Sequence, residues 1–277
     1  GRVLAGPGGG GAAPTLYVAP GGAADAAGTS CATAAYAKIN DAVGAASAGA
    51  TVVVCTGTYA EDVAVAKSLT LIASGAVTID ATGLDNGIKI SASNVTVSGF
   101  TVENATGEGI LAQQPNPVKG PLIQGTQLYT GAPLTHVTIQ RNVVMNNDQG
   151  GLPANAATTT YPECKESGNV PGDCGEAIHL WSVANSKVLF NTVSGNVGGI
   201  LLTDEFGPTH DNLIAGNTVT DNLFDCGITL PSHNLAMDPT THKFMPTFGG
   251  VYNNVVRYNV VSHNGGAGVG IFAPFPG

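Results

Sequence analysis

NTVSGNVGGILLTDEF, residues 191–206, and NTVTDNLFDCGITLPS, residues 217–232, are two copies of one pattern. In each copy two asparagines enclose a short strand-forming pair, and a Gly-Ile segment follows. The copies start 26 residues apart, from Asn191 to Asn217, a period typical of solenoid repeats. Short strands separated by Asn and Gly, which tolerate left-handed backbone at turns, predict the coils of an all-β parallel β-helix.

The same frame recurs along the chain, and it predicts how the coils stack. Each coil pairs only with its neighbours, so the strands are expected to be parallel and equivalent asparagines to hydrogen-bond in columns. The frame occupies Asn142–Asn147, Asn191–Asn196, Asn217–Asn222 and Asn259–Asn264, with Gly99–Asn104 as a fifth copy that begins with Gly.

Wider spacings between some copies predict long insertions. The first asparagines are 49 residues apart from Asn142 to Asn191 and 42 apart from Asn217 to Asn259. The insertions are expected to leave from one corner of the solenoid and to line one face, where function is expected. They cover residues 113–134, 152–174, 204–211 and 232–252.

The two ends of the chain differ from the repeats. Residues 1–14 are predicted to be a flexible leader, and residues 15–277 a single domain with a cap in 15–75 and coils in 76–277. Apolar residues at helical spacing predict a short amphipathic helix over 34–47, which closes the open end of the stack. The last Gly-Val strand is followed by no polar cap, so the C-terminal end is predicted to be uncapped or truncated. An open coil of this kind would allow self-association.

The charge and hydropathy exclude some classes of protein. The formal net charge is −9 with a pI near 4.9, which disfavours nucleic-acid binding and fits an extracellular protein. No apolar stretch is long enough to span a membrane.

The five cysteines indicate an oxidising compartment, so a secreted or periplasmic location is expected. Cys31 and Cys55 flank the first helical stretch and are predicted to staple the N-terminal cap. Cys164 and Cys174 are predicted to pin a polar loop. Cys226 is left over, and it is expected to pack as a small buried residue.

The stretch from Ala35 to Ser74, AYAKINDAV…GATVVVCTGTYAEDVAV…KSLTLIA, resembles the entrance to the pectin-lyase-like superfamily of right-handed parallel β-helices. SNVTVSGFTVENA, residues 93–105, and the Asn frames resemble the repeats of carbohydrate-acting and NosD-like proteins. The resemblance covers roughly residues 16–277 and implies a right-handed, single-stranded solenoid. It carries over no catalytic residue, because the site motifs of its polygalacturonases, pectate lyases, pectin methylesterases and mannuronan epimerases are absent.

Alignment of the coils on the Gly-Ile strand gathers the densest group of ionisable and aromatic residues. His179 and Trp181 share a face because side chains alternate along a strand. In this frame Asp204 lies near Ser232, and Glu205 lies near His233. The candidate catalytic residues are therefore His179, Asp204, Glu205 and His233, with Glu176 and Trp181 as candidate substrate-binding residues.

This group suits polysaccharide chemistry. In a lyase, His179 or His233 would be the base, and Asp204 with Glu205 would hold a cation, for which calcium is the candidate. In a glycoside hydrolase, one of those carboxylates would pair with Glu176 across about 5–9 Å. The competing interpretation is structural: the acidic residues cap turns, Trp181 packs under a loop, and the histidines form structural hydrogen bonds.

A second group, His242, Lys243, Tyr252, Arg257 and Tyr258, adds candidate substrate-binding residues. Lys243 or Arg257 would meet the carboxylate of an acidic sugar, and Tyr252 lies between them in the sequence. The sequence thus favours a secreted β-helix protein that binds and cleaves polysaccharide, with lyase chemistry ahead of hydrolysis. The alternatives are a non-catalytic surface or carbohydrate-binding scaffold and a NosD-like periplasmic role in metal handling.

Overall fold

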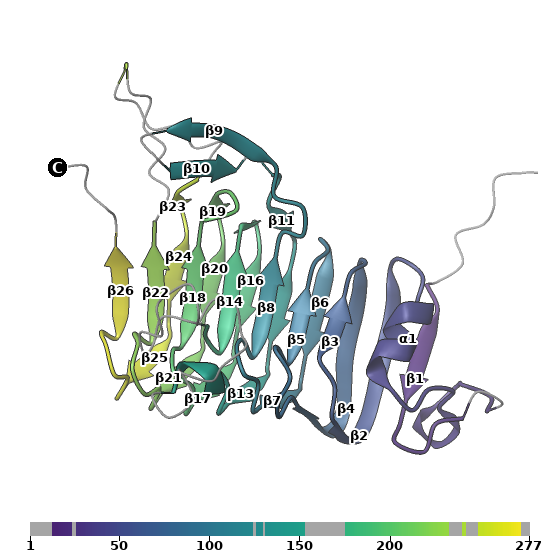
Figure 1. Ribbon diagram of the computed structural model, residues 1–277. Coiled ribbons are helices and arrows are strands. Elements are labelled where there is room, and N and C mark those ends of the chain that lie inside the picture. The colour runs from purple at the N-terminus through teal and green to yellow at the C-terminus, as the bar shows by residue number, and fades with distance from the viewer. Residues whose placement is uncertain are drawn as a thin grey trace, which may run out of the picture.

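The protein is a right-handed parallel β-helix in the computed structural model (Figure 1). The structure describes residues 13–23, 26–123, 126–129, 131–152, 175–232, 240–241 and 249–272. The coils stack from α1 at the N-terminal end to β26 at the C-terminal end (Figure 1). In the described part of the chain no helix is long and apolar enough to cross a membrane.

Sheet 1 is a seven-stranded parallel sheet that takes one short strand from each coil. Along each strand the side chains alternate between the core and the outer face. In β14, Ile178 and Leu180 are buried in the solenoid, while His179 and Trp181 face outward. The strands in stacking order are β3 (Val63–Val65), β5 (Ile88–Ile90), β8 (Ile110–Gln113), β14 (Ile178–Trp181), β18 (Ile200–Thr203), β22 (Ile228–Pro231) and β26 (Val269–Phe272).

Sheet 2 has thirteen strands and forms the other side of each coil in two rows. The first row is β6 (Val95–Ser98), β12 (Thr138–Gln140), β16 (Lys187–Leu189), β20 (Leu213–Ala215) and β24 (Val255–Arg257). The second row is β7 (Thr101–Glu103), β13 (Val143–Met145), β17 (Thr192–Ser194), β21 (Thr218–Thr220) and β25 (Val260–Ser262). The N-terminal strands β1 (Thr15–Val18), β2 (Ala50–Tyr59) and β4 (Leu69–Asp80) complete the sheet.

Smaller elements connect these sheets. Sheet 3 joins β11 (Leu134–Thr135), β15 (Val183–Ala184), β19 (Thr209–His210) and β23 (Val251–Tyr252). The antiparallel pair β9 (Lys119–Ile123) and β10 (Thr126–Tyr129) lies above the solenoid (Figure 1). The helical elements among the described residues are η1 (Cys31–Thr33), α1 (Ile39–Ala45) and η2 (Gln149–Gly151).

The predicted columns of asparagines are confirmed. Asn191 Nδ2 donates to Asn217 Oδ1 at 3.0 Å and to the Ile139 carbonyl oxygen at 3.0 Å. Each rung thus satisfies buried backbone groups of one coil and the amide of the next, which is why the residue recurs. The two full columns are Asn142, Asn191, Asn217 and Asn259, and Asn147, Asn196, Asn222 and Asn264. A shorter third column joins Asn212 to Asn254.

The N-terminal cap is present, but its helix is shorter than predicted. Helix α1 covers Ile39–Ala45, whereas residues 34–38 are outside it because Tyr36 bridges Val18 of β1. The Glu61 carboxylate accepts the backbone N–H of Ile39 at 2.7 Å and of Asn40 at 3.0 Å. Lys67 donates to the last helical carbonyls, so both ends of α1 are satisfied by side chains.

Strands β2 and β4, with ten and twelve residues, are much longer than the three-residue strands β12 and β13 of the later coils. Strand β4 pairs with β6 through Leu69–Ile72 and with β7 through Thr78–Asp80, so it spans both rows of sheet 2. The first coils lack the Asn turn that divides these rows later in the chain, and the backbone therefore stays extended.

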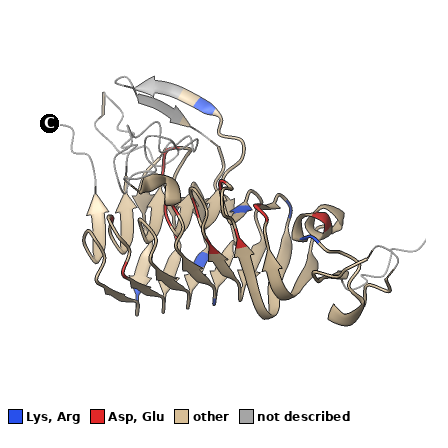
Figure 2. Ribbon diagram, turned by 60° about the horizontal axis from the view of Figure 1, so that its bottom comes forward, with Lys and Arg blue, Asp and Glu red and all other residues tan. Residues whose placement is uncertain are grey.

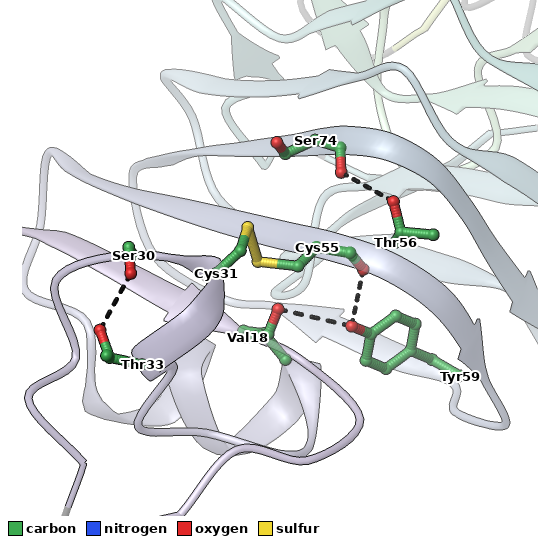
Figure 3. The surroundings of a disulfide bond; sticks show 8 residues. All are labelled: Val18, Ser30, Cys31, Thr33, Cys55, Thr56, Tyr59 and Ser74. Atoms are coloured by element: carbon green, nitrogen blue, oxygen red, sulfur yellow. Dashed lines mark hydrogen bonds between the residues drawn. A yellow bond between two sulfur atoms is a disulfide. The ribbon is translucent and has the colours of Figure 1, made fainter.

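The predicted Cys31–Cys55 disulfide is confirmed and ties η1 to β2 (Figure 3). Beside it, the Tyr59 hydroxyl donates to the Cys55 carbonyl oxygen at 2.8 Å, and burial raises the pKa of Tyr59 to about 12. Cys226 is a buried free cysteine, as expected. Cys164 and Cys174 lie outside the described residues.

The insertions leave from two places rather than from one corner. Those at 113–134, 204–211 and 232–252 follow the C-terminal ends of β8, β18 and β22, whereas 152–174 precedes the start of β14. Both ends of a sheet 1 strand can accept an insertion without breaking the stack, and the sequence pattern does not separate them. At the C-terminal end Val269 and Ile271 continue the core columns of Ile228 and Leu230, yet they are 46% and 78% exposed.

Candidate functional site

One column on sheet 1 holds two buried carboxylates. Glu108 stands two residues before Ile110 of β8, and Glu176 stands two residues before Ile178 of β14, so the parallel register places them in adjacent coils. Their relative exposures are 0% and 3%. Because an ionised carboxylate is costly to bury without a partner, this pair requires compensating contacts.

His179 connects Glu108 to the next coil. Its Nδ1 lies 2.7 Å from Glu108 Oε1, and its Nε2 lies 2.8 Å from Thr203 Oγ1 of β18. If Glu108 is ionised its carboxylate only accepts, so Nδ1–H donates to it; Nε2 then accepts the Thr203 hydroxyl in a neutral ring or donates to Thr203 Oγ1 in a protonated one. His179 is 4% exposed and Thr203 2%, so this chain of hydrogen bonds is closed to solvent.

Glu176 completes the cluster from the other side. Its backbone N–H donates to Glu108 Oε2 at 2.8 Å. Its side chain extends over Gly198 of the following coil, where a β-carbon would stand 2.6 Å from Glu176 Cγ. Glycine at position 198 therefore makes room for the carboxylate. One ligand-type atom from each of Glu108, Glu176 and His179 lies within 4.8 Å of the others.

Aromatic rings flank the cluster on the outer face of sheet 1. Trp181 stacks on His179 with ring centroids 5.3 Å apart, and Phe206 stacks on Trp181 at 4.4 Å. Tyr129 of β10 meets Phe206 edge to face at 5.4 Å. Trp181, Phe206 and Tyr129 are partly exposed, so the stack runs from a buried histidine to the surface.

Asp204 follows β18 and ties three segments together. Its Oδ2 accepts the Ser232 hydroxyl at 3.0 Å and the Gly250 N–H at 2.6 Å. The predicted proximity of Asp204 and Ser232 is thus confirmed. The side chain is fully buried, and these contacts fix the ends of the loops after β18 and β22.

Comparison with known proteins identifies the family. The family model described as "Periplasmic copper-binding protein (NosD)" matches residues 45–238, well over half of the chain. The chain belongs to the NosD family. Among curated proteins, none matches the sequence of this NosD-family member.

Two solved structures are similar to it at low identity. The crystal structure of pectate lyase Pel9A has a TM-score of 0.46 and 11% identity, over 95% of this chain and 77% of that one. A pectin methylesterase from Aspergillus niger has a TM-score of 0.36 and 12% identity, over 92% of this chain and 86% of that one.

The predicted site residues are only partly brought together in this NosD-family member. His179, Glu176 and Trp181 lie at the cluster, but His179 and Asp204 are buried rather than set in the solvent-open groove expected of a catalytic site. Glu205 is partly buried next to Asp204 in sequence. His233 and Lys243 lie outside the described residues. The catalytic roles stay predictions.

Tyr252 and Arg257 lie elsewhere, on sheet 3 and on the first row of sheet 2. Tyr252 stacks on His210 at 4.9 Å, and burial together with the Asp211 carboxylate raises its pKa. Arg257 lines a shallow pocket of about 340 Å³ with Asp211 and Val255. Their role as substrate-binding residues stays a prediction.

Glu108 is the residue that sequence reasoning missed. The signal was present, because GEGI at 107–110 and GEAI at 175–178 share a frame, and alignment of the Gly-Ile strands puts both glutamates in one column. The separation of 68 residues between Glu108 and Glu176 concealed it, since the large insertion at 152–174 hides which coils are adjacent.

Proposed function

We propose that this chain is a periplasmic or extracellular β-helix protein that binds a divalent transition-metal ion through Glu108, Glu176 and His179. The observation that carries the proposal is the buried cluster itself, in which three ligand-type atoms lie within 4.8 Å of one another. Two carboxylates and one imidazole on a rigid sheet are positioned without loop rearrangement. The family description, "Periplasmic copper-binding protein (NosD)", supports both the proposed location and a transition metal as the bound ion.

The donor set favours copper(II), or another borderline divalent ion, over copper(I). Imidazole and carboxylate donors suit divalent ions, whereas copper(I) selects thiolate and thioether sulfur. The nearest thiol in this column, Cys226, stands two coils beyond Glu176, and burial raises its pKa and keeps it protonated. The cluster residues therefore fit copper as the oxidised ion.

Thr203 has a defined part in this proposal. An ion held by His179 Nδ1 would require the ring proton to be on Nε2, where Thr203 Oγ1, 2.8 Å away, would accept it. Such a contact fixes the tautomer and the orientation of the imidazole, as outer partners of metal-bound histidines do. Thr203 is thus a positioning residue.

Titration of metal-free protein with copper(II) and zinc(II), followed by isothermal calorimetry and electron paramagnetic resonance, tests the proposal. We expect one copper(II) site with nitrogen coupling from a single imidazole, which is lost in His179→Ala and weakened in Glu108→Gln and Glu176→Gln. Asp204→Asn, a buried carboxylate outside the cluster, is the matched control and keeps the site. Unchanged binding in all three cluster variants would overturn the proposal.

Asp204 and Glu205 form the competing candidate site, for calcium. The same titration is therefore repeated with calcium. Calcium prefers six to eight oxygen ligands. Asp204 already accepts two hydrogen bonds through Oδ2, which leaves it fewer lone pairs for an ion. Calcium binding that is lost in Asp204→Asn and kept in His179→Ala would place the ion there instead.

A second candidate function, contact with polysaccharide, is favoured by the partly exposed stack of Trp181, Phe206 and Tyr129. Stacked rings suit the apolar face of a sugar. A polysaccharide panel, with and without calcium, read for unsaturated uronides and for reducing ends, separates lyase from hydrolase activity. Loss of product in His179→Ala or His233→Ala would support cleavage by a histidine base. Binding without product that is lost in Trp181→Ala would support a non-catalytic scaffold.

A further inference from the structure

At the turn between the two rows of sheet 2, residues with left-handed backbone conformation form a column along the stacked coils. We name it the Phe190 corner, and it consists of Gly99, Arg141, Phe190, Gly216 and Tyr258. All five residues have positive φ, between 54° and 88°. Successive residues occupy adjacent coils, so the column runs parallel to the solenoid axis with the ordinary strand spacing of about 4.8 Å.

The side chains in this column are not those that the backbone favours. Left-handed backbone is readily adopted by Gly, Asn and Asp and is costly for bulky residues. At the other described turns the non-glycine residues with positive φ are Asn, Asp, His or Ser, whereas the Phe190 corner holds Arg, Phe and Tyr. Strain that persists at an exposed position indicates a function for the side chain.

These exposed side chains lie in one column, and together with Arg257 beside Tyr258 they make up a strip parallel to the solenoid axis. Phe190 is 56% exposed and Tyr258 84%. The Phe190 ring extends over Gly216, where a β-carbon would come within 2.5 Å of it, so this glycine leaves room for the ring. The Arg141 guanidinium carbon lies 6.0 Å from the Phe190 ring centroid, and that of Arg257 lies 5.5 Å from the Tyr258 ring centroid.

The charge of the strip is opposite to that of the molecule. The chain has a net charge of −9 and only 10 Lys and Arg residues, and those in the described part of the chain are scattered (Figure 2). Arg141 and Arg257 nevertheless stand at the two ends of one aromatic strip. Each guanidinium beside a ring still presents N–H donors that can pair with a carboxylate in bidentate fashion.

We propose that the Phe190 corner binds a linear acidic glycan that lies along the solenoid axis. The rings would contact the apolar faces of the sugars, and Arg141 and Arg257 would pair with their carboxylates. The pocket of about 340 Å³ beside Arg257 adjoins the strip, and its Asp211 carboxylate is already bonded to His210 at 2.6 Å. This surface is separate from the proposed metal site on sheet 1.

Other anionic partners fit the corner less well. Extended peptides are recognised through unpaired strand edges or grooves, and this corner is a ridge between two strand rows that are already paired. Membrane surfaces and nucleic acids require larger basic areas than two arginines in a chain of net charge −9.

Affinity electrophoresis in gels that contain polygalacturonate tests the proposal on the full chain. We expect retardation of the wild type in this gel and none in a gel with a neutral glucan. Arg141→Gln/Arg257→Gln and Phe190→Asn/Tyr258→Asn should each weaken binding at least tenfold, and the asparagine variant should keep or raise the melting temperature. Lys187→Gln and Phe224→Asn are matched controls for charge and for an exposed ring, and they should bind as the wild type does.

The remaining outcomes overturn the proposal. Equal retardation of both double variants and the wild type would place the glycan elsewhere. If only Arg141→Gln/Arg257→Gln lost retardation, the two arginines would bind the glycan by charge alone and the rings would have no part in binding. No retardation by polygalacturonate, with binding instead to anionic phospholipid vesicles or to a poly-glutamate peptide, would assign the corner to another class of partner.

Discussion

The asparagine columns and the Glu108 cluster are both buried and polar, yet they are organised in opposite ways. The columns repeat one neutral residue in successive coils, and each amide bonds to the identical amide of the next coil. The cluster occurs once in the described residues, combines two carboxylates with an imidazole, and interrupts columns that hold Gly198 and Leu201 one coil further on. Repetition marks polar groups that support the fold, whereas a buried charged group without repetition indicates function.

The largest expected effect comes from breaking a column. Asn191→Leu removes the acceptor of Asn142 and the donor to the Ile139 carbonyl, leaving several buried polar groups unsatisfied. The free energy of unfolding should fall by roughly 3–5 kcal/mol, since each such group costs about 1–3 kcal/mol. Urea unfolding measures it, with Asn185→Gly, an exposed left-handed turn residue, as the control that changes little. A loss below about 1 kcal/mol would contradict the structural role of the columns.

The second effect concerns the cluster and should be smaller. Glu108→Gln weakens the contact with His179 Nδ1 and should cost about 1.5–3 kcal/mol, the range for hydrogen bonds to charged groups. Thr203→Val removes the contact at Nε2. Because both act on His179, the double variant should be less destabilised than the sum of the two. Additive losses in thermal unfolding would show that the three residues do not form one network.

Glu61 provides a third case for this comparison. Like the Glu108 cluster it occurs once and not in every coil, but it lies at the N-terminal end of helix α1. Glu61→Ala removes the acceptor for two N–H groups at the start of α1 and should cost about 1 kcal/mol, as other helix-capping side chains do. Glu61→Gln keeps an acceptor and should cost less. Calorimetric unfolding distinguishes them, and equal losses would mean that charge rather than hydrogen bonding stabilises the helix.

The smallest expected effect has the opposite sign. Phe190→Asn places a residue that tolerates left-handed backbone where the structure holds a bulky one. It should leave stability unchanged or raise it by up to about 1 kcal/mol, which is the lower end of the cost of such strain. A clear drop in the melting temperature would show that the Phe190 ring stabilises the fold through its contact with Gly216.

The sequence predicts the repeating parts of this protein well because repetition carries the signal. The frame from Asn191 to Asn217 is enough to predict the strands, the parallel stacking and the amide columns. The start of α1 was missed because the bridge between Tyr36 and Val18 is a tertiary contact that helical periodicity does not reveal. Glu108 was missed because its partner in the next coil follows a long insertion.

The solvent exposure of the candidate site could not be predicted either. The alternation along β14 correctly put His179 and Trp181 on the outer face, but a position on the outer face does not make a side chain exposed. His179 is therefore buried although it points away from the core. Residue type and face indicate which groups meet, and only the packing of neighbouring coils and loops determines whether solvent reaches them.

The most direct test of the central claim is copper(II) binding to metal-free protein and to its Glu176→Gln variant, followed by electron paramagnetic resonance. Glu176 supplies a ligand atom, and its backbone N–H, which donates to Glu108 Oε2, is kept in the variant, so the substitution tests the metal site while this contact to the Glu108–His179–Thr203 network is retained. We predict one site with single-imidazole coupling, whose affinity for copper(II) falls at least about tenfold in the variant. Equal affinity and an unchanged spectrum would contradict it and leave the cluster as a structural network.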